Sequence, residues 1–270
     1  LSLSTYPLVT HHGDKEARSG GRTYLSHLLG TSVAFVLPAM IYCYWKKGGD
    51  INFTDGSLLT TDIGSGAGLI VLLAFTFGFA KNGLMPFHSW LPNAMVAPTP
   101  VSALLHAVAV VKVGVFCVIR VFTGVFGIEL LEKLDIAVVV SWIAAFTVIT
   151  SSLIALSQDN LKRRLAFSTI GQLSYIILGV SLLSDFGVTG SILHVAMHAF
   201  GKITLFFCAG AIYVAMHKKY VSELVGIGRK MPITMTAFAI GSLSVIGLPF
   251  TGGLVSKWYL VMGTAQSDQI

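Results

Sequence analysis

The stretch that decides the fold is GVTGSILHVAMHAFGKITLFFCAGAIYVAM, residues 187–216. It is longer than the roughly 20 apolar residues that a helix needs to cross a bilayer. Yet it contains His194, His198 and Lys202, which follow one another at steps of four. Each step of four turns an α-helix by only about 40°. We therefore predict one membrane-spanning helix with a polar track along one face.

The rest of the chain has the composition of a membrane protein. Of its 270 residues, 54% are hydrophobic and 11% are charged, and the mean hydropathy is +0.78. Soluble domains carry about 25% charged residues. The net charge of +6 comes largely from short loops between apolar runs, which argues against nucleic-acid binding. The cysteines stand alone in apolar segments, so we expect no disulfide, zinc or iron–sulfur site: Cys43, Cys117 and Cys208.

The apolar segments predict an all-α bundle that crosses the membrane seven times, with the second and last crossings interrupted. Both KNGLMPFHSWLPNAMVAPTP (81–100) and IGLPFTGGLVSKWYL (246–260) group prolines and glycines, and each pairs Pro-Phe with a lysine and a tryptophan. Irregular backbone at membrane depth is tolerated only inside protein or beside a water-filled cavity, and two such breaks are typical of transporters. The likeness hints at repeats of opposite topology, with chance recurrence of Pro-Phe as the alternative. The expected crossings are 24–45, 65–85, 99–122, 135–156, 165–184, 188–216 and 231–264.

Loop charges predict the orientation. Ten Lys and Arg residues fall in the loops 11–23, 157–164 and 217–230, which we therefore place in the cytoplasm by the positive-inside rule. The opposite side holds four basic residues, Lys46, Lys47, Arg120 and Lys133, among seven acidic ones: Asp50, Asp55, Asp62, Glu129, Glu132, Asp135 and Asp185.

Several titratable residues remain within or beside the apolar segments, and all twelve acidic residues fall in loops or termini. A charged side chain at the centre of a membrane helix costs about 2.5 to 3.5 kcal/mol. A buried lysine can lose its proton and so carry protons, and histidine titrates near neutral pH. We interpret the set as a proton path: Lys81, His106, Lys112, His194, His198, Lys202 and Lys257.

Other interpretations stay open for these residues. His194 and His198 could ligate a metal or haem, or only hydrogen-bond between helices. Lys112 and Lys257 could extend to the membrane interface. His106 and Lys112 are six residues apart, so we expect them on different faces of their helix rather than in one stripe.

The stretch DNLKRRLAFSTIGQLSY (159–175) carries a different signal. Asp159 or Asn160 can cap a helix whose first turn is basic. We interpret it as a topological anchor at the cytoplasmic boundary.

Four blocks resemble one family of membrane proteins. AKNGLMPFHSWLPNAMVAPTPVSALLHAVAVVKVGVF (80–116) resembles the signature of the antiporter-like subunits. These include the large proton-pumping subunits of respiratory complex I, Mrp-type sodium/proton antiporter subunits and membrane hydrogenase relatives. Residues 157–179, 194–213 and 247–260 are similar to the same family in the same order.

The resemblance implies fourteen helices in two inverted five-helix repeats, each with one broken helix. It implies that residues 1–270 are a single proton-conducting domain, which works with other membrane subunits and holds no cofactor. Lys81 would be the gate, Lys202 the central carrier, and Lys257 the exit. His194 and His198 would form the relay, with His106 and Lys112 at polar positions of the path.

One departure from the family concerns Lys81. The family pairs this lysine with a glutamate on the preceding helix, and the chain begins at Leu1, at what looks like the end of that helix. We expect a piece of a longer protein that lacks this glutamate and the last two helices, and that does not pump by itself.

Within the family, SKWYL (256–260) and YPLVTHHGDKEA (6–17) favour the D-type subunit of Mrp antiporters. A complex I or membrane hydrogenase subunit is the alternative. We expect H+ as the transported ion, with Na+ or K+ as candidate exchange ions, in a bacterial or archaeal inner membrane. No motif for NADH, flavin or quinone is found. A haem-binding redox subunit and a passive scaffold are the contrasting hypotheses.

Overall fold

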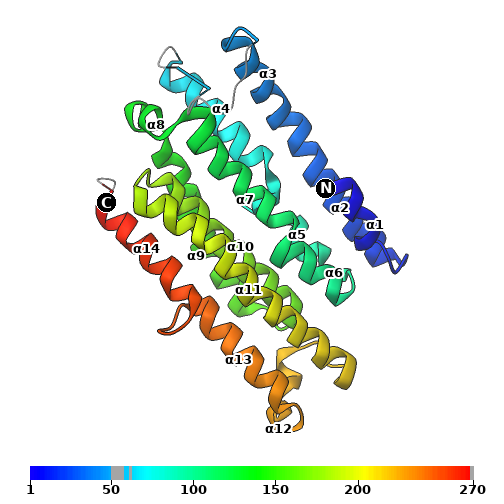
Figure 1. Cartoon of the computed structure of the whole chain (residues 1–270). Helices are drawn as coiled ribbons and strands as arrows, with labels where there is room; N and C mark the ends of the chain where they lie inside the picture. The colour runs from blue at the N-terminus through cyan, green and yellow to red at the C-terminus, as the bar shows by residue number, and fades with distance from the viewer. Residues whose placement is uncertain (50–57, 61–62, 268–270) are drawn as a thin grey trace.

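The computed structural model describes residues 1–49, 58–60 and 63–267. Within these ranges the chain is helical, and the long helices run roughly side by side in one bundle (Figure 1). The predicted all-α membrane fold is confirmed. Three aspartates of the predicted charge pattern lie outside the described residues: Asp50, Asp55 and Asp62.

The first three crossings occupy the first half of the chain. The helix formed by α2, η1 and α3 is continuous from Lys15 to Lys46, and a second continuous helix runs from Thr99 to Phe126. The elements are α1 (Ser2–Val9), α2 (Lys15–Thr31), the π-helical turn η1 (Ser32–Val36), α3 (Leu37–Lys46), α4 (Ser65–Gly78), the 3₁₀ turn η2 (Ala80–Asn82), α5 (Trp90–Asn93), the 3₁₀ turn η3 (Ala94–Val96), α6 (Thr99–Ala103), the π-helical turn η4 (Leu104–Val108), α7 (Val110–Arg120) and the π-helical turn η5 (Val121–Phe126).

Four further crossings follow. After the short α8, two antiparallel helices pack along their length as α9 and α10, and the long α11 lies between α10 and the last broken helix. The elements are α8 (Ile128–Leu134), α9 (Ala137–Ser157), α10 (Leu161–Ser181), α11 (Asp185–Met216), the 3₁₀ turn η6 (Val221–Leu224), α12 (Ile227–Lys230), α13 (Pro232–Ile246) and α14 (Gly252–Gln266).

Both predicted breaks are present. In the first, α4 ends at Gly78, residues 83–89 are irregular, and the next long helix begins at Thr99. In the second, α13 ends at Ile246, Gly247 takes a left-handed conformation with φ of 88°, and α14 begins at Gly252. Four helices in the described ranges are both long and apolar enough to span a membrane unbroken; the two split crossings and the more polar α10 are the three expected crossings that are not among them.

The prediction of a polar loop over 11–23 is wrong in part. Helix α2 begins at Lys15, because the Asp14 carboxylate accepts a hydrogen bond of 2.6 Å from the Ala17 backbone N–H and caps the helix. The helix therefore includes charged residues that precede the apolar segment 24–45, which was predicted as the first crossing.

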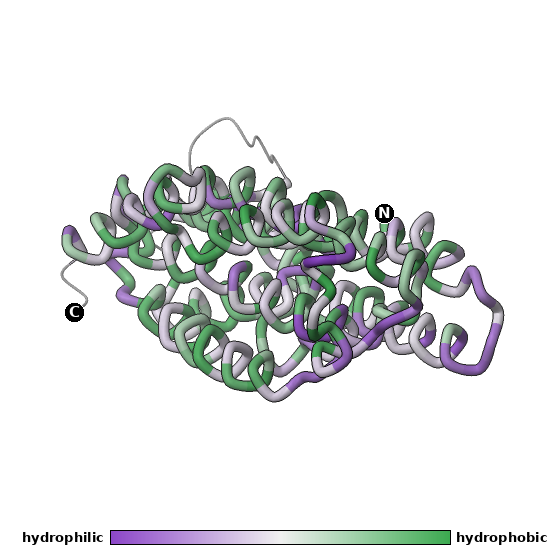
Figure 2. Tube along the Cα trace, turned by 90° about the horizontal axis from the view of Figure 1, so that it is seen from below, coloured by the Kyte–Doolittle hydropathy of each residue, from purple (hydrophilic) through white to green (hydrophobic). Residues whose placement is uncertain are grey.

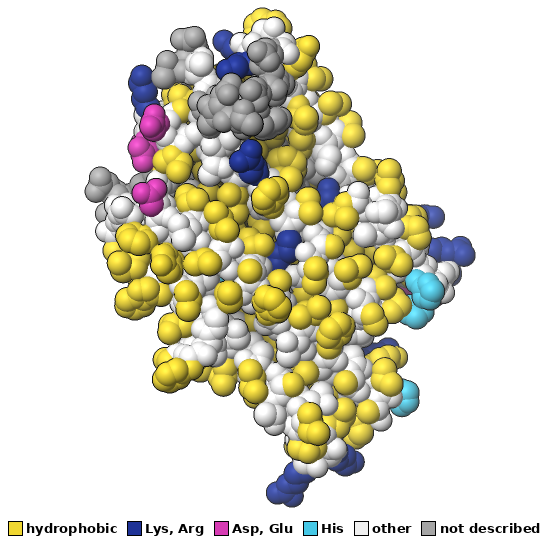
Figure 3. Space-filling view, in the orientation of Figure 1, with side chains coloured by type: hydrophobic (Ala, Val, Ile, Leu, Met, Phe, Trp, Pro, Cys, Tyr) yellow, Lys and Arg dark blue, Asp and Glu magenta, His cyan; other side chains and the backbone are white. Residues whose placement is uncertain are grey.

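The three basic loops meet at one end of the bundle, as predicted. A cavity of about 990 Å³ is lined by His12 from the first loop, Asn160 from the second and Lys219 from the third. Carboxylates gather at the opposite end, where the space-filling view shows them near α8 (Figure 3). The shared end of the loops is therefore established, and its cytoplasmic placement stays a prediction.

The surface between these ends is apolar. Large side chains such as Trp142 and Leu156 are 72% and 74% exposed on α9, which is the environment of lipid-facing residues. Hydropathy colouring shows hydrophobic residues along the helices and hydrophilic ones mostly at turns (Figure 2). The buried polar groups inside the bundle therefore stand out as exceptions that need partners.

Candidate functional site

The predicted track on α11 faces the interior of the bundle. His194 and His198 are each 2% exposed and Lys202 is fully buried, and the two imidazole rings lie 6.0 Å apart between centroids. Because the three residues are spaced by four along one helix, a single packing face buries all of them. The prediction of one polar face is confirmed.

Lys202 is held by α10. Its ammonium donates a hydrogen bond of 2.7 Å to the Ser168 hydroxyl and one of 3.3 Å to the Leu165 carbonyl. A buried cation without acceptors would be costly, and these two neutral oxygens supply them. Among the described residues, no carboxylate forms a hydrogen bond with Lys202.

His194 is bound on both sides of its ring. Nδ1 lies 2.9 Å from the Ser256 hydroxyl on α14, and Nε2 lies 3.1 Å from the Gln172 side-chain carbonyl oxygen on α10. Three helices therefore meet at this imidazole: α10, α11 and the second half of the broken crossing.

Lys112 joins the track from α7. Its ammonium is 2.5 Å from Nδ1 of His198, and the residue is only 8% exposed. The alternative in which Lys112 extends to the interface is therefore wrong. The Nε2 atom of His198 is buried and has no hydrogen-bond partner among the described residues.

His106 also faces α11. Its ring is fully buried and packs 5.5 Å from the Phe206 ring, and neither ring nitrogen has a partner within the described part of the chain. Lys112 meets α11 at His198, eight residues before Phe206, which is about 12 Å along a helix. The two residues thus form no single stripe, as predicted, although both side chains reach α11.

The two break lysines differ in their surroundings. Lys81 lies in η2, half buried, and its backbone packs against Gly114 of α7. Its ammonium makes no hydrogen bond with the described residues. Lys257 donates 2.9 Å and 3.0 Å hydrogen bonds to the Val245 and Ile246 carbonyls at the end of α13. Lys257 therefore bridges the second break, and the structure does not bring Lys81 into the hydrogen-bonded group.

Polar residues of the site outside the predicted set come mainly from α10. Ser168, Gln172 and Tyr175 lie on one face, because their spacing of four and three residues matches the helical repeat. Ser168 meets Lys202, Gln172 meets His194, and the Tyr175 ring lies 5.4 Å from the Lys257 ammonium. This spacing was readable in the sequence.

The anchor interpretation of this segment is incomplete. Arg164 donates to the Ala155, Leu156 and Gln158 carbonyls at the end of α9, which ties the start of α10 to its neighbour. Asn160 caps α10 as expected. The same helix also supplies the residues that meet Lys202 and His194.

The hydrogen bonds bear on the metal and haem hypothesis. Both nitrogens of His194 and Nδ1 of His198 are already engaged by protein groups. Among the described residues no cluster of three His, Cys, Asp or Glu side chains is suited to a metal. The titratable residues of α11 lie in separate hydrogen-bonded groups along one face of the helix.

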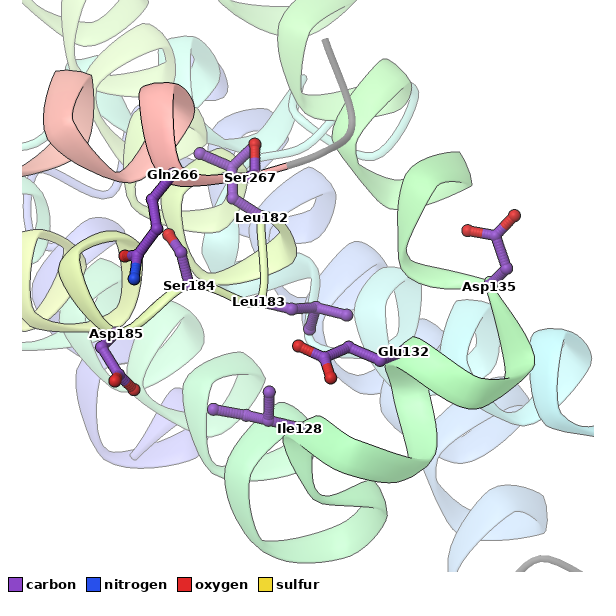
Figure 4. A pocket seen from close by; sticks show the side chains of 9 residues that line it. All are labelled: Ile128, Glu132, Asp135, Leu182, Leu183, Ser184, Asp185, Gln266 and Ser267. Carbon is purple, nitrogen blue, oxygen red and sulfur yellow. The ribbon is translucent and has the colours of Figure 1, made fainter.

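A second cavity lies at the acidic end of the bundle. Its volume is about 570 Å³, and Glu132 of α8 and Asp185 at the start of α11 line it (Figure 4). Together with the cavity at the basic end, it places one cavity at each end of the bundle.

Comparison with known proteins decides the family. The family described as NADH:quinone oxidoreductase/Mrp antiporter, TM, matches residues 1–270. The chain belongs to this family. It is therefore an integral membrane protein that crosses the membrane several times, as the apolar helices indicate.

Relatives in this family come from several kinds of complex. NADH-quinone oxidoreductase subunit N of Desulforudis audaxviator is 36% identical over 98% of this chain and 53% of its own length. Hydrogenase-4 component B of Escherichia coli is 31% identical over 96% of this chain and 40% of its own length. The chain thus spans about half the length of the curated relatives it matches, or less.

Two solved structures share the fold. A chain of the Mrp complex from Dietzia sp. DQ12-45-1b superposes with a TM-score of 0.85 at 25% identity, covering 98% of this chain and 29% of that chain. A chain of the archaeal membrane-bound sulfane sulfur reductase gives a TM-score of 0.84 at 28% identity, over 98% of this chain and 54% of that chain.

Proposed function

We propose that the chain is the proton-conducting part of a membrane subunit in a multisubunit complex. The observation that carries the proposal is the buried network around α11, in which Lys112 contacts His198, and His194 and Lys202 contact α10. A network of titratable groups is expensive inside a membrane and marks ion or proton pathways. The cavities at both ends support access from the two sides.

Within the network, Lys202 would be the central carrier and the two histidines the relay. Lys81 would act as the gate at the first break, and Lys257 as the exit at the second. Charge changes nearby alter the proton affinity of each lysine, so protons can be loaded and released in sequence.

The finer proposal is the D-type subunit of an Mrp antiporter, which exchanges H+ for Na+ or K+. The superposition on a chain of the Mrp complex supports an Mrp-type protein, and the D-type assignment rests on the sequence of residues 6–17 and 256–260. The identity of 36% with an NADH-quinone oxidoreductase subunit supports the alternative, a proton-pumping complex I subunit without redox centres of its own. A membrane hydrogenase subunit belongs to the same alternative.

The test is proton movement in inverted membrane vesicles that carry the complete protein with its partner subunits. Dissipation of the proton gradient that depends on Na+ is expected for the Mrp-type function. NADH-driven acidification without a Na+ response would instead support the complex I type.

Lys202→Ala in the same vesicles tests the proton path itself. We expect loss of proton movement in either case. Unchanged proton movement in this variant would contradict the proton path and favour the hypothesis of a passive scaffold. A Soret band in the optical spectrum of the purified protein would instead favour the haem hypothesis.

A further inference from the structure

The two hydrogen bonds of His194 constrain its protonation. With the Gln172 amide oriented so that its side-chain oxygen lies 3.1 Å from Nε2, that oxygen can only accept a hydrogen bond, and Nε2 then carries the hydrogen of the neutral ring. Nδ1 is then the unprotonated nitrogen that can accept a proton. Among the described residues its one hydrogen-bond partner is the Ser256 hydroxyl, at 2.9 Å. His194 is therefore set to accept a proton from the side of α14.

The Ser256 hydroxyl has a second acceptor. Its oxygen lies 3.2 Å from the Gly253 carbonyl of its own helix, and the residue is fully buried. When His194 is neutral, the hydroxyl donates to Nδ1. When Nδ1 is protonated, the ring donates to the hydroxyl oxygen, and the hydroxyl turns to the Gly253 carbonyl. The direction of this hydrogen bond can reverse by rotation of one hydroxyl, without backbone movement.

We infer that Ser256 is the proton-transfer residue that joins the second broken helix to the track on α11, and that Gln172 is the positioning residue that makes Nδ1 of His194 the accepting atom. The inference rests on the proposed function and adds two residues to it. It also gives the broken helix a direct chemical link to the track, in addition to the Lys257 contact that bridges the break.

The transfer balances with a hydrated proton as the co-reactant. A hydronium ion gives a proton to the Ser256 oxygen while the original hydroxyl proton passes to Nδ1 of His194. One O–H bond of the hydroxyl breaks and is replaced by a new one, an N–H bond forms on the ring, a water is left, and the single positive charge moves onto the imidazole.

Gln172 also controls what happens next. The neutral Gln172 amide accepts a hydrogen bond from Nε2–H but does not take the proton. While this hydrogen bond persists, a charged His194 can lose a proton only from Nδ1. The next titratable ring on the helix is His198, 6.0 Å away between centroids, with a buried Nε2 that has no partner among the described residues. Release of Gln172 is thus the step that opens the track toward His198.

The first experiment compares serine variants of the complete protein, with its partner subunits, in energised inverted vesicles. We expect Ser256→Ala to slow proton movement on the order of tenfold, the effect of losing one buried hydrogen bond. Ser256→Thr keeps a hydroxyl and is expected to restore the rate to within about twofold of wild type. Ser174→Ala is the matched control, because Ser174 is a fully buried serine that bonds only the Ile170 carbonyl of its own helix among the described residues.

The second experiment reads the ring directly. In the detergent-purified complete protein labelled with ¹⁵N-histidine, the His194 signals are assigned by their loss in His194→Asn. We expect the neutral Nε2–H tautomer in wild type and a mixture of tautomers in Gln172→Leu. This readout does not depend on whether Ser256→Ala assembles.

The outcomes separate the two proposals. If Lys202→Ala blocks proton movement while Ser256→Ala retains the wild-type rate, the inference about Ser256 is wrong and the proposed function stands. If Lys202→Ala leaves movement unchanged, the proposed function fails. A wild-type His194 found in the Nδ1–H tautomer overturns the role of Gln172.

Discussion

The close contact between α13 and α14 at the second break depends on Gly253, and its replacement gives a sharp prediction. A Cβ at Gly253 would lie 1.7 Å from the Ser244 carbonyl oxygen, whereas real Cβ atoms keep at least 3.0 Å. Gly253→Ala therefore moves α14 away from α13 by about 1.3 Å or more. Overpacking of this kind costs about 1 to 3 kcal/mol of folding free energy, and we expect a lower midpoint of thermal unfolding in detergent.

The same displacement has a local consequence at Lys257. Its ammonium is 2.9 Å from the Val245 carbonyl oxygen, and a shift of 1.3 Å along this direction would lengthen the contact to about 4 Å, beyond hydrogen-bonding distance. We therefore expect Gly253→Ala to slow proton movement in vesicles of the complete protein, in addition to lowering its stability.

Gly66→Ala is the matched control for this variant. Gly66 is also the second residue of its helix, α4, and among the described residues no atom outside its own stretch of helix lies within 4 Å of an added Cβ. Alanine there is expected to be neutral or to stabilise by up to about 1 kcal/mol through helix propensity. If Gly253→Ala melted at the wild-type midpoint, the close contact between α13 and α14 would be refuted.

Three further predictions concern contacts that hold the bundle around the site. Trp90→Phe removes the 2.8 Å hydrogen bond from the indole N–H to the Ala80 carbonyl, which keeps a 3.1 Å bond from the Gly83 backbone N–H, so we expect a loss of about 0.5 to 1.5 kcal/mol for one hydrogen bond, measured by thermal unfolding. Arg164→Lys loses the planar group that bonds three carbonyls at the end of α9, and faster hydrogen exchange is expected there. Hydrogen bonds from Ser222 hold the pKa of Asp159 below its usual range. This contribution is present at neutral pH and lost as pH falls below the range of a free carboxyl, so proteolysis of the 217–224 loop should increase at acid pH in wild type but not in Asp159→Asn.

Local sequence patterns predicted the parts of this structure that depend on local geometry. The track on α11 follows from the spacing of His194 and Lys202, because a helix places residues at steps of four on one face. The second break follows from the glycines and proline after Ile246, which cannot continue a helix. Both features need no knowledge of neighbouring helices.

Features that depend on packing between helices were not predicted. Ser168 and Gln172 look like ordinary polar residues of α10, and only the position of that helix beside α11 makes them partners of the track. Lys112 could have faced the interface, and its contact with His198 follows from how α7 approaches α11. The loop predicted before the first crossing became helical because a single cap, Asp14, outweighed the charged composition that follows it.

The hydrogen-bond partners of Lys112, Lys202 and Lys257 share one property that bears on their function. Lys202 donates to a hydroxyl and a carbonyl, Lys257 to two carbonyls, and Lys112 to an imidazole. Among the described residues, each acceptor is neutral. A lysine paired with a buried carboxylate would leave an uncompensated charge on losing its proton, at a cost of about 3 to 5 kcal/mol. A lysine held by neutral acceptors leaves no such charge, so the network can bind and release protons while its hydrogen-bonding oxygens stay in place.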